Sequence, residues 1–343
     1  MKQFIIQENE AGQRFDKYLK KLLKNAATGF LYKMLRKKNI TLNEKKAEGS
    51  EILKTGDTVR LFLSDETFDK FSGTASSDDD YAIYTQNDLA ENNLDIQFED
   101  DHILVFNKPA GMLSQKANSE DISVNEYLIG YLLSKEELTR EMLRTFKPAA
   151  ANRLDRNTSG LILCGKTLAG LQYLSKVIKN RTLEKYYRCI VEGSILEREL
   201  LEGYLSKDSV KNQVAISTKA DEHTSYVKTE IDPIGQYEYR DRTYTELSVH
   251  LITGKPHQIR AHLSSIGHPI LGDKKYGGSI KLTPKRQEEN KLPTIKRQLL
   301  HAYRVVFPDT QGDFSYLSGK SLTAELPHDY KSILKELQNG NME

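Results

Sequence analysis

The sequence predicts an α+β protein: a mixed, largely antiparallel central sheet with flanking helices, plus a small N-terminal α/β domain. Three observations lead to this class. Strand and turn patterns alternate from about residue 200 to 272, without the regular strand–helix repeat of a parallel sheet. Helical stripes interrupt the strands at only a few places. Finally, a sharp change of charge separates the first 64 residues from the rest.

The N-terminal segment is basic and helical. Apolar residues recur at helical spacing in 13–23 and 29–38, and strand patterns follow as far as residue 63. Residues 14–46 carry eleven Lys or Arg against two acids. Such cations repel one another, and a polyanion relieves that repulsion by releasing its counterions. We therefore expect a nucleic-acid-binding domain over residues 1–64; a solvated lysine-rich face is the alternative. The cations expected to make contacts are Arg14, Lys17, Lys20, Lys21, Lys33, Arg36, Lys37 and Lys38.

An acidic stretch follows the basic domain. Residues 65–101 carry twelve acids against one lysine, and Ser72–Asp80 contains almost nothing that could be buried. The composition predicts an acidic flexible linker over residues 65–95. A larger domain is expected over residues 96–343.

The larger domain opens with an apolar strand within residues 102–111, which ends at Pro109 and turns at Gly111. Further strands are expected at 161–166 and 184–191, with a helical stripe between them at 168–178; a short helix at 329–337 closes the chain. The two cysteines, Cys164 and Cys189, lie in apolar strand-like runs and are expected to be buried and reduced.

Composition excludes several classes. Hydrophobic residues make up 38% and charged residues 29% of the 343, no apolar run is long enough to span a membrane, and no signal peptide is recognisable. We expect a cytoplasmic protein. Phosphate-binding glycine motifs are absent, so no nucleotide cofactor is expected. His257, His262 and His268 are spaced by five and six residues, which does not favour a metal site, and we expect structural roles for them.

Asp155 is the residue most indicative of chemistry. It lies between Arg153 and Arg156 and precedes Thr-Ser-Gly and a buried strand. An acid at the end of a buried strand, held by guanidinium groups, is a common form of reactive carboxylate. The alternative is a structural turn in which an arginine pairs with the aspartate.

Residues 152–160, Asn-Arg-Leu-Asp-Arg-Asn-Thr-Ser-Gly, resemble the H-R-L-D-x-x-T-S-G signature of the RluA-type pseudouridine synthases. Residues 107–111 are similar to the family's N-K-P-A/S-G motif, and 185–187 to its K-x-Y motif. Residues 254–273 resemble its long G-[RK]-x-H-Q-I-R-x-H-L…G-H-P-[IV]-x-G-D segment, and His301 lies in a weaker L-H-A match. Residues 13–63 resemble the RNA-binding module of ribosomal protein S-four.

The resemblance implies a pseudouridine synthase fold and an enzyme that isomerises uridine in RNA, with large-subunit ribosomal RNA as the expected partner and no cofactor. The sequence is silent on oligomeric state, and we expect a monomer. Asp155 matches the catalytic aspartate, Tyr187 a tyrosine that could stack on the base, and Arg260 the arginine that pairs with the aspartate. A guanidinium keeps its own charge and so keeps a partly buried carboxylate ionised. Arg153 matches an arginine thought to help open the RNA. Asn152 departs from the family, which has histidine there.

Two alternatives from other classes remain open at this point. The chain could be a non-catalytic RNA-binding protein that has kept the fold. It could also be a glycosidase-like hydrolase of the same bond, which would need two carboxylates flanking that bond. The sequence near Asp155 offers arginines but no second acid, so none is expected at the site.

Overall fold

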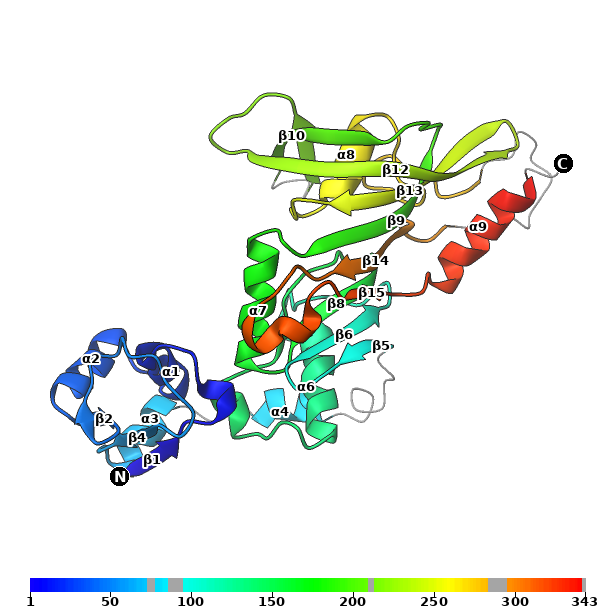
Figure 1. Ribbon diagram of the computed structural model, residues 1–343. Helices are drawn as coiled ribbons and strands as arrows, with labels where there is room; N and C mark the ends of the chain where they lie inside the picture. The colour runs from blue at the N-terminus through cyan, green and yellow to red at the C-terminus, as the bar shows by residue number, and fades with distance from the viewer. Residues whose placement is uncertain (73–77, 86–94, 209–212, 283–294, 341–343) are drawn as a thin grey trace.

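Two sheets organise the chain (Figure 1). The computed structural model describes residues 1–72, 78–85, 95–208, 213–282 and 295–340. Over these residues the structure contains a four-stranded antiparallel sheet near the N-terminus and an eleven-stranded sheet in the larger part. The prediction of an α+β protein with a small N-terminal α/β unit is therefore confirmed.

The N-terminal unit packs two helices on its sheet, in the strand order β1-β4-β2-β3. Phe15, Leu19 and Leu22 recur on one face of the first helix and are buried, so its lysines are left on the surface. The elements are β1 (Lys2–Ile5), η1 (Glu8–Glu10), α1 (Phe15–Leu22), α2 (Thr28–Arg36), β2 (Ile40–Leu42), β3 (Lys45–Lys46) and β4 (Thr58–Leu61).

The segment expected as a flexible linker contains two helices, α3 (Asp65–Ser72) and α4 (Asp78–Tyr84). Phe68 of α3 is buried in the N-terminal core and Tyr84 of α4 in the core of the larger unit, at 4% exposure each. These aromatic side chains give each helix an apolar anchor that the acidic composition concealed. The other part of the predicted linker lies outside the described residues.

The large sheet has the strand order β11-β10-β12-β13-β9-β14-β8-β6-β5, and β15 and β7 pair off this path with β14 and β8. Its described pairings are antiparallel except β14 with β8, which is parallel. The strands are β5 (Ile96–Glu99), β6 (Ile103–Lys108), β7 (Ala149–Ala150), β8 (Ser159–Gly165), β9 (Glu184–Glu192), β10 (Glu199–Asp208), β11 (Gln213–Ser217), β12 (Ser225–Tyr239), β13 (Arg242–Leu251), β14 (Leu300–Val306) and β15 (Ser321–Thr323).

Helices cover both faces of the sheet, which explains why β8 is apolar throughout. Leu161 and Leu163 pack with the helix α7, whereas Ile162 and Cys164 pack with α6 on the opposite face. Cys164 and Cys189 are both buried and free, as expected. The helices of this unit are α6 (Val124–Ser134), η2 (Met142–Arg144), α7 (Leu168–Lys179), α8 (Gln258–Ser265), η3 (Gly312–Leu317) and α9 (His328–Gly340).

One glycine sets the approach of the central strands. Gly160 has φ +116°, and a Cβ at this position would overlap the backbone of Ala302 on β14. Only glycine therefore permits the parallel pairing of β14 with β8 at this point. That pairing fixes the start of β8, directly after the loop that carries Asp155.

The two units contact each other through η1 and the segment that leads from η2 into β7. Thr145 Oγ1 donates a 2.5 Å hydrogen bond to Glu10 Oε1, and η1 also lies against α7. Figure 1 shows the N-terminal unit beside α4 and α7. Among the described residues, the helices are all too short or too polar to cross a bilayer.

Candidate active site

Asp155 lies within a tightly bonded loop between β7 and β8. Ser114 fixes the residue before it, because its hydroxyl donates to Leu154 O at 2.8 Å and accepts from Leu154 N at 3.0 Å. Thr158 N donates to Asp155 O at 3.0 Å, which closes the turn after it. The Asp155 side chain keeps 25% of its surface exposed. Its backbone is therefore fixed while its carboxylate remains accessible.

Lys108 joins two of the sequence motifs. Its ammonium donates to the carbonyls of Pro109 and Met112 at 2.9 Å each and of Arg156 at 3.2 Å. These three acceptors match the three donors of an ammonium group. Burial, with a smaller contribution from the charge of Arg297, lowers the pKa of Lys108 to about 7. Gly111 N also donates to Arg156 O, so the 107–111 motif holds the Asp155 loop directly.

Arg260 links two carboxylates. Its Nη1 donates to Asp155 Oδ2 at 2.8 Å, while Nε and Nη2 donate to the two oxygens of Asp273 at 2.6 and 2.8 Å. Burial alone would lower the pKa of Arg260, but its hydrogen bonds to Asp273 and the charges of Asp273 and Asp155 raise it overall. The helix α8 thus presents a permanent cation whose orientation is set by Asp273. The prediction that Arg260 lies beside Asp155 is confirmed.

Asp273 corrects the expectation that no second acid lies near Asp155. It shares Arg260 with Asp155, although 118 positions separate the two along the chain. The Asp273 side chain is 1% exposed, and both of its oxygens accept from Arg260. A buried, fully bonded carboxylate cannot flank a substrate bond. In the sequence, the feature that could have pointed to Asp273 is the Gly-Asp pair that ends the 254–273 segment.

His257 lies at the site, contrary to the expectation of a purely structural residue. Its Nε2 is 3.9 Å from Asp155 Oδ2, and its Nδ1 lies 3.0 Å from the Tyr276 hydroxyl. Burial lowers the pKa of His257, against the opposing effect of the Asp155 charge. The ring is therefore neutral near pH 7. Its φ of +55° places it at the N-cap of α8, so the chain turns sharply there to aim Arg260.

Tyr187 on β9 is 6% exposed and belongs to the same core cluster as Leu154, the neighbour of Asp155. Burial raises the pKa of Tyr187, and the charge of Asp155 raises it further. The phenol is therefore protonated at neutral pH. Tyr186 points to the opposite face, where it stacks on His250 at 4.7 Å, so the expected alternation of the two tyrosines is confirmed.

The other predicted histidines have structural partners. His262 Nδ1 lies 2.8 Å from Thr229 Oγ1, His268 Nδ1 is 2.8 Å from Glu192 O, and His301 Nδ1 is 2.9 Å from Ser159 Oγ. In the part of the chain that the structure describes, no group of three His, Cys, Asp or Glu is placed to hold a metal ion.

The hydrogen bonds of Asn152 account for its departure from the family pattern, which has histidine at this position. The Asn152 side chain accepts from Leu163 N at 2.8 Å and donates to Leu161 O at 3.3 Å. This bridge to β8 needs a donor and an acceptor but no charge. Arg153, next to it, is exposed beside the site.

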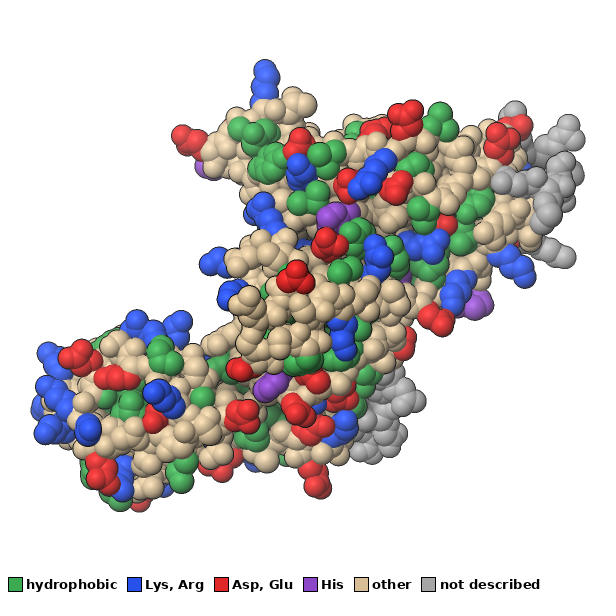
Figure 2. Space-filling view, in the orientation of Figure 1, with side chains coloured by type: hydrophobic (Ala, Val, Ile, Leu, Met, Phe, Trp, Pro, Cys, Tyr) green, Lys and Arg blue, Asp and Glu red, His purple; other side chains and the backbone are tan. Residues whose placement is uncertain are grey.

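The predicted RNA-contacting cations of the N-terminal unit are exposed, and Figure 2 shows a blue cluster over this unit. Two of them have partners within the protein. Arg14 pairs with Asp16 through two hydrogen bonds of 3.1 Å, and Lys21 donates to Gln13 Oε1 at 2.9 Å. The remaining six are Lys17, Lys20, Lys33, Arg36, Lys37 and Lys38, and their role stays a prediction.

The fold and the site together define a class. Residues 102–265 match the family model described as RNA pseudouridylate synthase. A solved human structure, RNA Pseudouridylate Synthase Domain Containing 4, shares the fold with a TM-score of 0.54 and 18% identity, covering 71% of this chain and 92% of that one.

Curated relatives extend the match over almost the whole chain. An uncharacterized RNA pseudouridine synthase of Mycoplasma genitalium is 30% identical over 93% of this chain and 93% of its own length. The ribosomal large subunit pseudouridine synthase C of Haemophilus influenzae is 28% identical, over 99% of this chain and 96% of its own. The chain belongs to the RluA-type RNA pseudouridine synthase family, and it is an isomerase of that class.

Proposed function

We propose that this chain converts uridine to pseudouridine in large-subunit ribosomal RNA, with Asp155 as the catalytic residue. One observation carries the proposal. Arg260 donates a hydrogen bond to the accessible Asp155, and the buried Asp273 fixes the orientation of the Arg260 guanidinium. The relatives named as ribosomal large subunit pseudouridine synthases support this class of RNA. The work of such an enzyme belongs to ribosome biogenesis in the cytoplasm.

The reaction rearranges one nucleotide and needs no redox partner. The bond between ribose C1′ and uracil N1 breaks, and a bond between C1′ and uracil C5 forms. The proton on C5 is lost and N1 gains a proton, so atoms and charge balance. The target base must leave its stack to reach the site, at a cost of roughly a few kcal/mol. Asp155 acts on the sugar, either as a nucleophile or by removing a sugar proton.

Three side chains support Asp155 in this proposal. Arg260 keeps a cation 2.8 Å from the carboxylate throughout the reaction. Tyr187 offers a ring on which the base can stack and a protonated hydroxyl, since burial raises its pKa. Arg153 is exposed within the Asp155 loop, which supports a contact with the opened RNA.

The N-terminal unit supplies binding without sequence selection. Its exposed lysines contact phosphates, which position the RNA and raise its local concentration but carry no base information. Sequence choice then falls to the larger unit, where the nucleotide is extruded.

The test uses unmodified large-subunit ribosomal RNA with tritium at uracil C5. We expect the chain to release tritium and to leave pseudouridine at discrete positions. A non-catalytic RNA-binding protein would release none. A hydrolase would yield free uracil, and either result would overturn the proposal.

A further inference from the structure

Lys185 is a buried cation in the described structure that the site above does not use. It lies on β9 two residues before Tyr187, so the two side chains leave the strand on the same face. Its exposure is 9%, and none of the described residues gives its ammonium a hydrogen bond or an ion pair. A buried charge without a partner is costly, so an anion bound beside Lys185 would stabilise its charged form.

A second cation and a glycine lie near the Lys185 ammonium. Burial lowers the pKa of Lys185, and the nearby charge of Arg181 lowers it further. On its other side lies Gly254: a Cβ there would come within 3.4 Å of Lys185 Nζ. Two cations held close together beside a glycine are the arrangement that an anion would stabilise.

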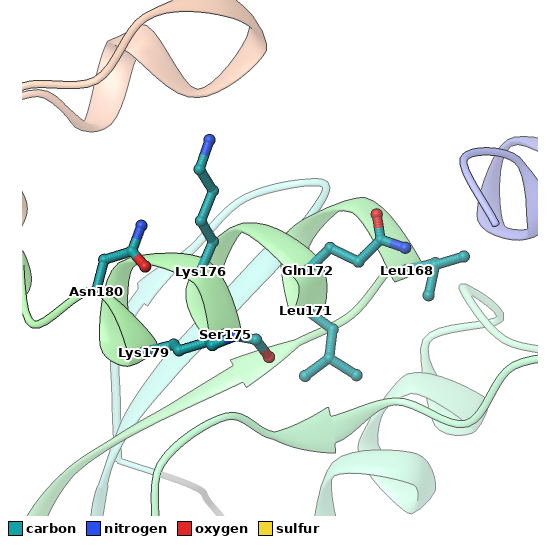
Figure 3. A pocket seen from close by; sticks show the side chains of 7 residues that line it. All are labelled: Leu168, Leu171, Gln172, Ser175, Lys176, Lys179 and Asn180. Atoms are coloured by element: carbon teal, nitrogen blue, oxygen red, sulfur yellow. The ribbon is translucent and has the colours of Figure 1, made fainter.

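A line of cations continues from Arg181 along α7. Lys176 and Lys179 are exposed on the last turns of this helix, and no described residue pairs with either. They line a groove of about 480 Å³ (Figure 3), in which Lys176 points away from the helix into open space. Lysines near a helix C-terminus are common, because they complement the helix dipole, so position alone does not decide their role.

The groove continues to the N-terminal unit. A second groove shares Leu168 and Leu171 with the first, and it adds Lys21 of α1 and Arg144 of η2. Among the described residues that line the two grooves, none is acidic. Figure 2 shows blue side chains projecting from the edge where Figure 1 places α7, between the N-terminal unit and the β10–β12 hairpin.

We propose that Lys185, Arg181 and the α7 lysines form a phosphodiester track that carries the RNA strand from the Asp155 site to the N-terminal unit. The proposal rests on the proposed function, since it describes the path of that enzyme's RNA. Its ligand is the sugar–phosphate backbone, without regard to base. Lys185 binds the strand next to the extruded nucleotide. Lys21 and Arg144 bind it at the interface of the two units.

Two variants and one control test the track with polyuridylate, whose binding does not require turnover. The variants are Lys176→Ala/Lys179→Ala on the α7 groove and Lys185→Met at the buried end. The control, Lys331→Ala/Lys335→Ala, removes two exposed charges from α9, which lies far from α7 (Figure 1). Binding is measured across a range of salt concentrations.

Affinity for RNA falls as salt rises, so the plot of log affinity against log salt has a negative slope. Removal of one cation that neutralises a phosphate should reduce the magnitude of this slope by about 0.7 for a single strand. We therefore expect a drop of about 1.4 for the α7 variant and about 0.7 for Lys185→Met, with none for the control. Lys185→Met should also unfold no more easily than the parent, because it removes an uncompensated buried charge. A merely structural lysine would give the opposite pattern, with lower stability and an unchanged slope.

A slope unchanged in both variants, or reduced equally in the control, would overturn the track. The proposed function is read separately, from tritium release by the unaltered chain on ribosomal RNA. An active parent with unaltered slopes in the variants would therefore refute the track and leave the function standing. With a functioning track, the α7 variant should raise KM for long RNA while kcat at saturating RNA stays close to that of the parent.

Discussion

Replacing Asp273 by Asn tests whether the Arg260 bridge stabilises the fold as well as orienting the site. Asp273 accepts from Arg260 at 2.6 and 2.8 Å and is 1% exposed, while the Arg260 side chain is 8% exposed. An asparagine keeps the shape but turns one acceptor into a donor, which then faces a guanidinium N–H. Removing one partner of a buried pair costs about 3–5 kcal/mol, and we expect a reduction in stability of that size.

The chain contains a matched control. Asp329 accepts from Arg297 with the same two distances, 2.6 and 2.8 Å, but its side chain is 53% exposed. Arg297 is as buried as Arg260, at 8% exposure, so the two pairs differ in the exposure of the carboxylate alone. Water can replace the exposed Asp329 carboxylate as a partner, so Asp329→Asn should cost about 1 kcal/mol, on the scale of exposed ion pairs.

Urea unfolding followed by circular dichroism measures both. If the slope is about 3 kcal/mol/M, Asp273→Asn moves the midpoint by about 1 M or more and Asp329→Asn by less than about 0.4 M. The kcat of Asp273→Asn should fall as well, because Arg260 loses the anchor that aims it at Asp155. Equal shifts in the two midpoints would refute the argument that burial makes this pair essential.

Two further predictions concern Tyr187 and the buried histidines. Tyr187→Phe keeps the ring for stacking and should leave RNA binding unchanged; if the hydroxyl takes part in proton movement, single-turnover assays will show a rate about 10²-fold lower, and an unchanged rate would limit Tyr187 to stacking. Burial lowers the pKa of His262 and of His301 to about 4. In the unfolded chain both histidines have pKa values near 6.5, so between pH 4 and 6.5 the unfolded chain binds more protons than the folded one. The free energy of unfolding is therefore highest above pH 6.5 and falls as the pH is lowered towards 4. Urea midpoints measured from pH 7 to 5 should decline, and a flat profile would contradict the assignment of neutral buried histidines.

Much of the site followed from local sequence because its residues lie in contiguous motifs. Asp155, Tyr187 and Arg260 each sit in a recognisable string, and alternation on a strand separated Tyr187 from Tyr186. Periodicity also located β8, β9, α7 and α9, whose apolar residues recur at strand or helix spacing.

The residues that were missed act through tertiary contacts. Asp273 reaches Asp155 only through Arg260, and His257 approaches it only because its φ of +55° bends the chain before α8. Sequence spacing carries no information on either distance. Likewise, the acidic composition of α3 and α4 hid the buried aromatic residues, Phe68 and Tyr84, that anchor them to the two cores.

The measurement that tests the central claim most directly is the activity of Asp155→Asn. The variant should bind RNA within about twofold of the parent, since the N-terminal unit and its phosphate contacts are unaltered. Tritium release in a single turnover should be undetectable, while Asp313→Asn, an exposed change on η3, should behave like the parent. Pseudouridine formed by Asp155→Asn at close to the parental rate would contradict the account.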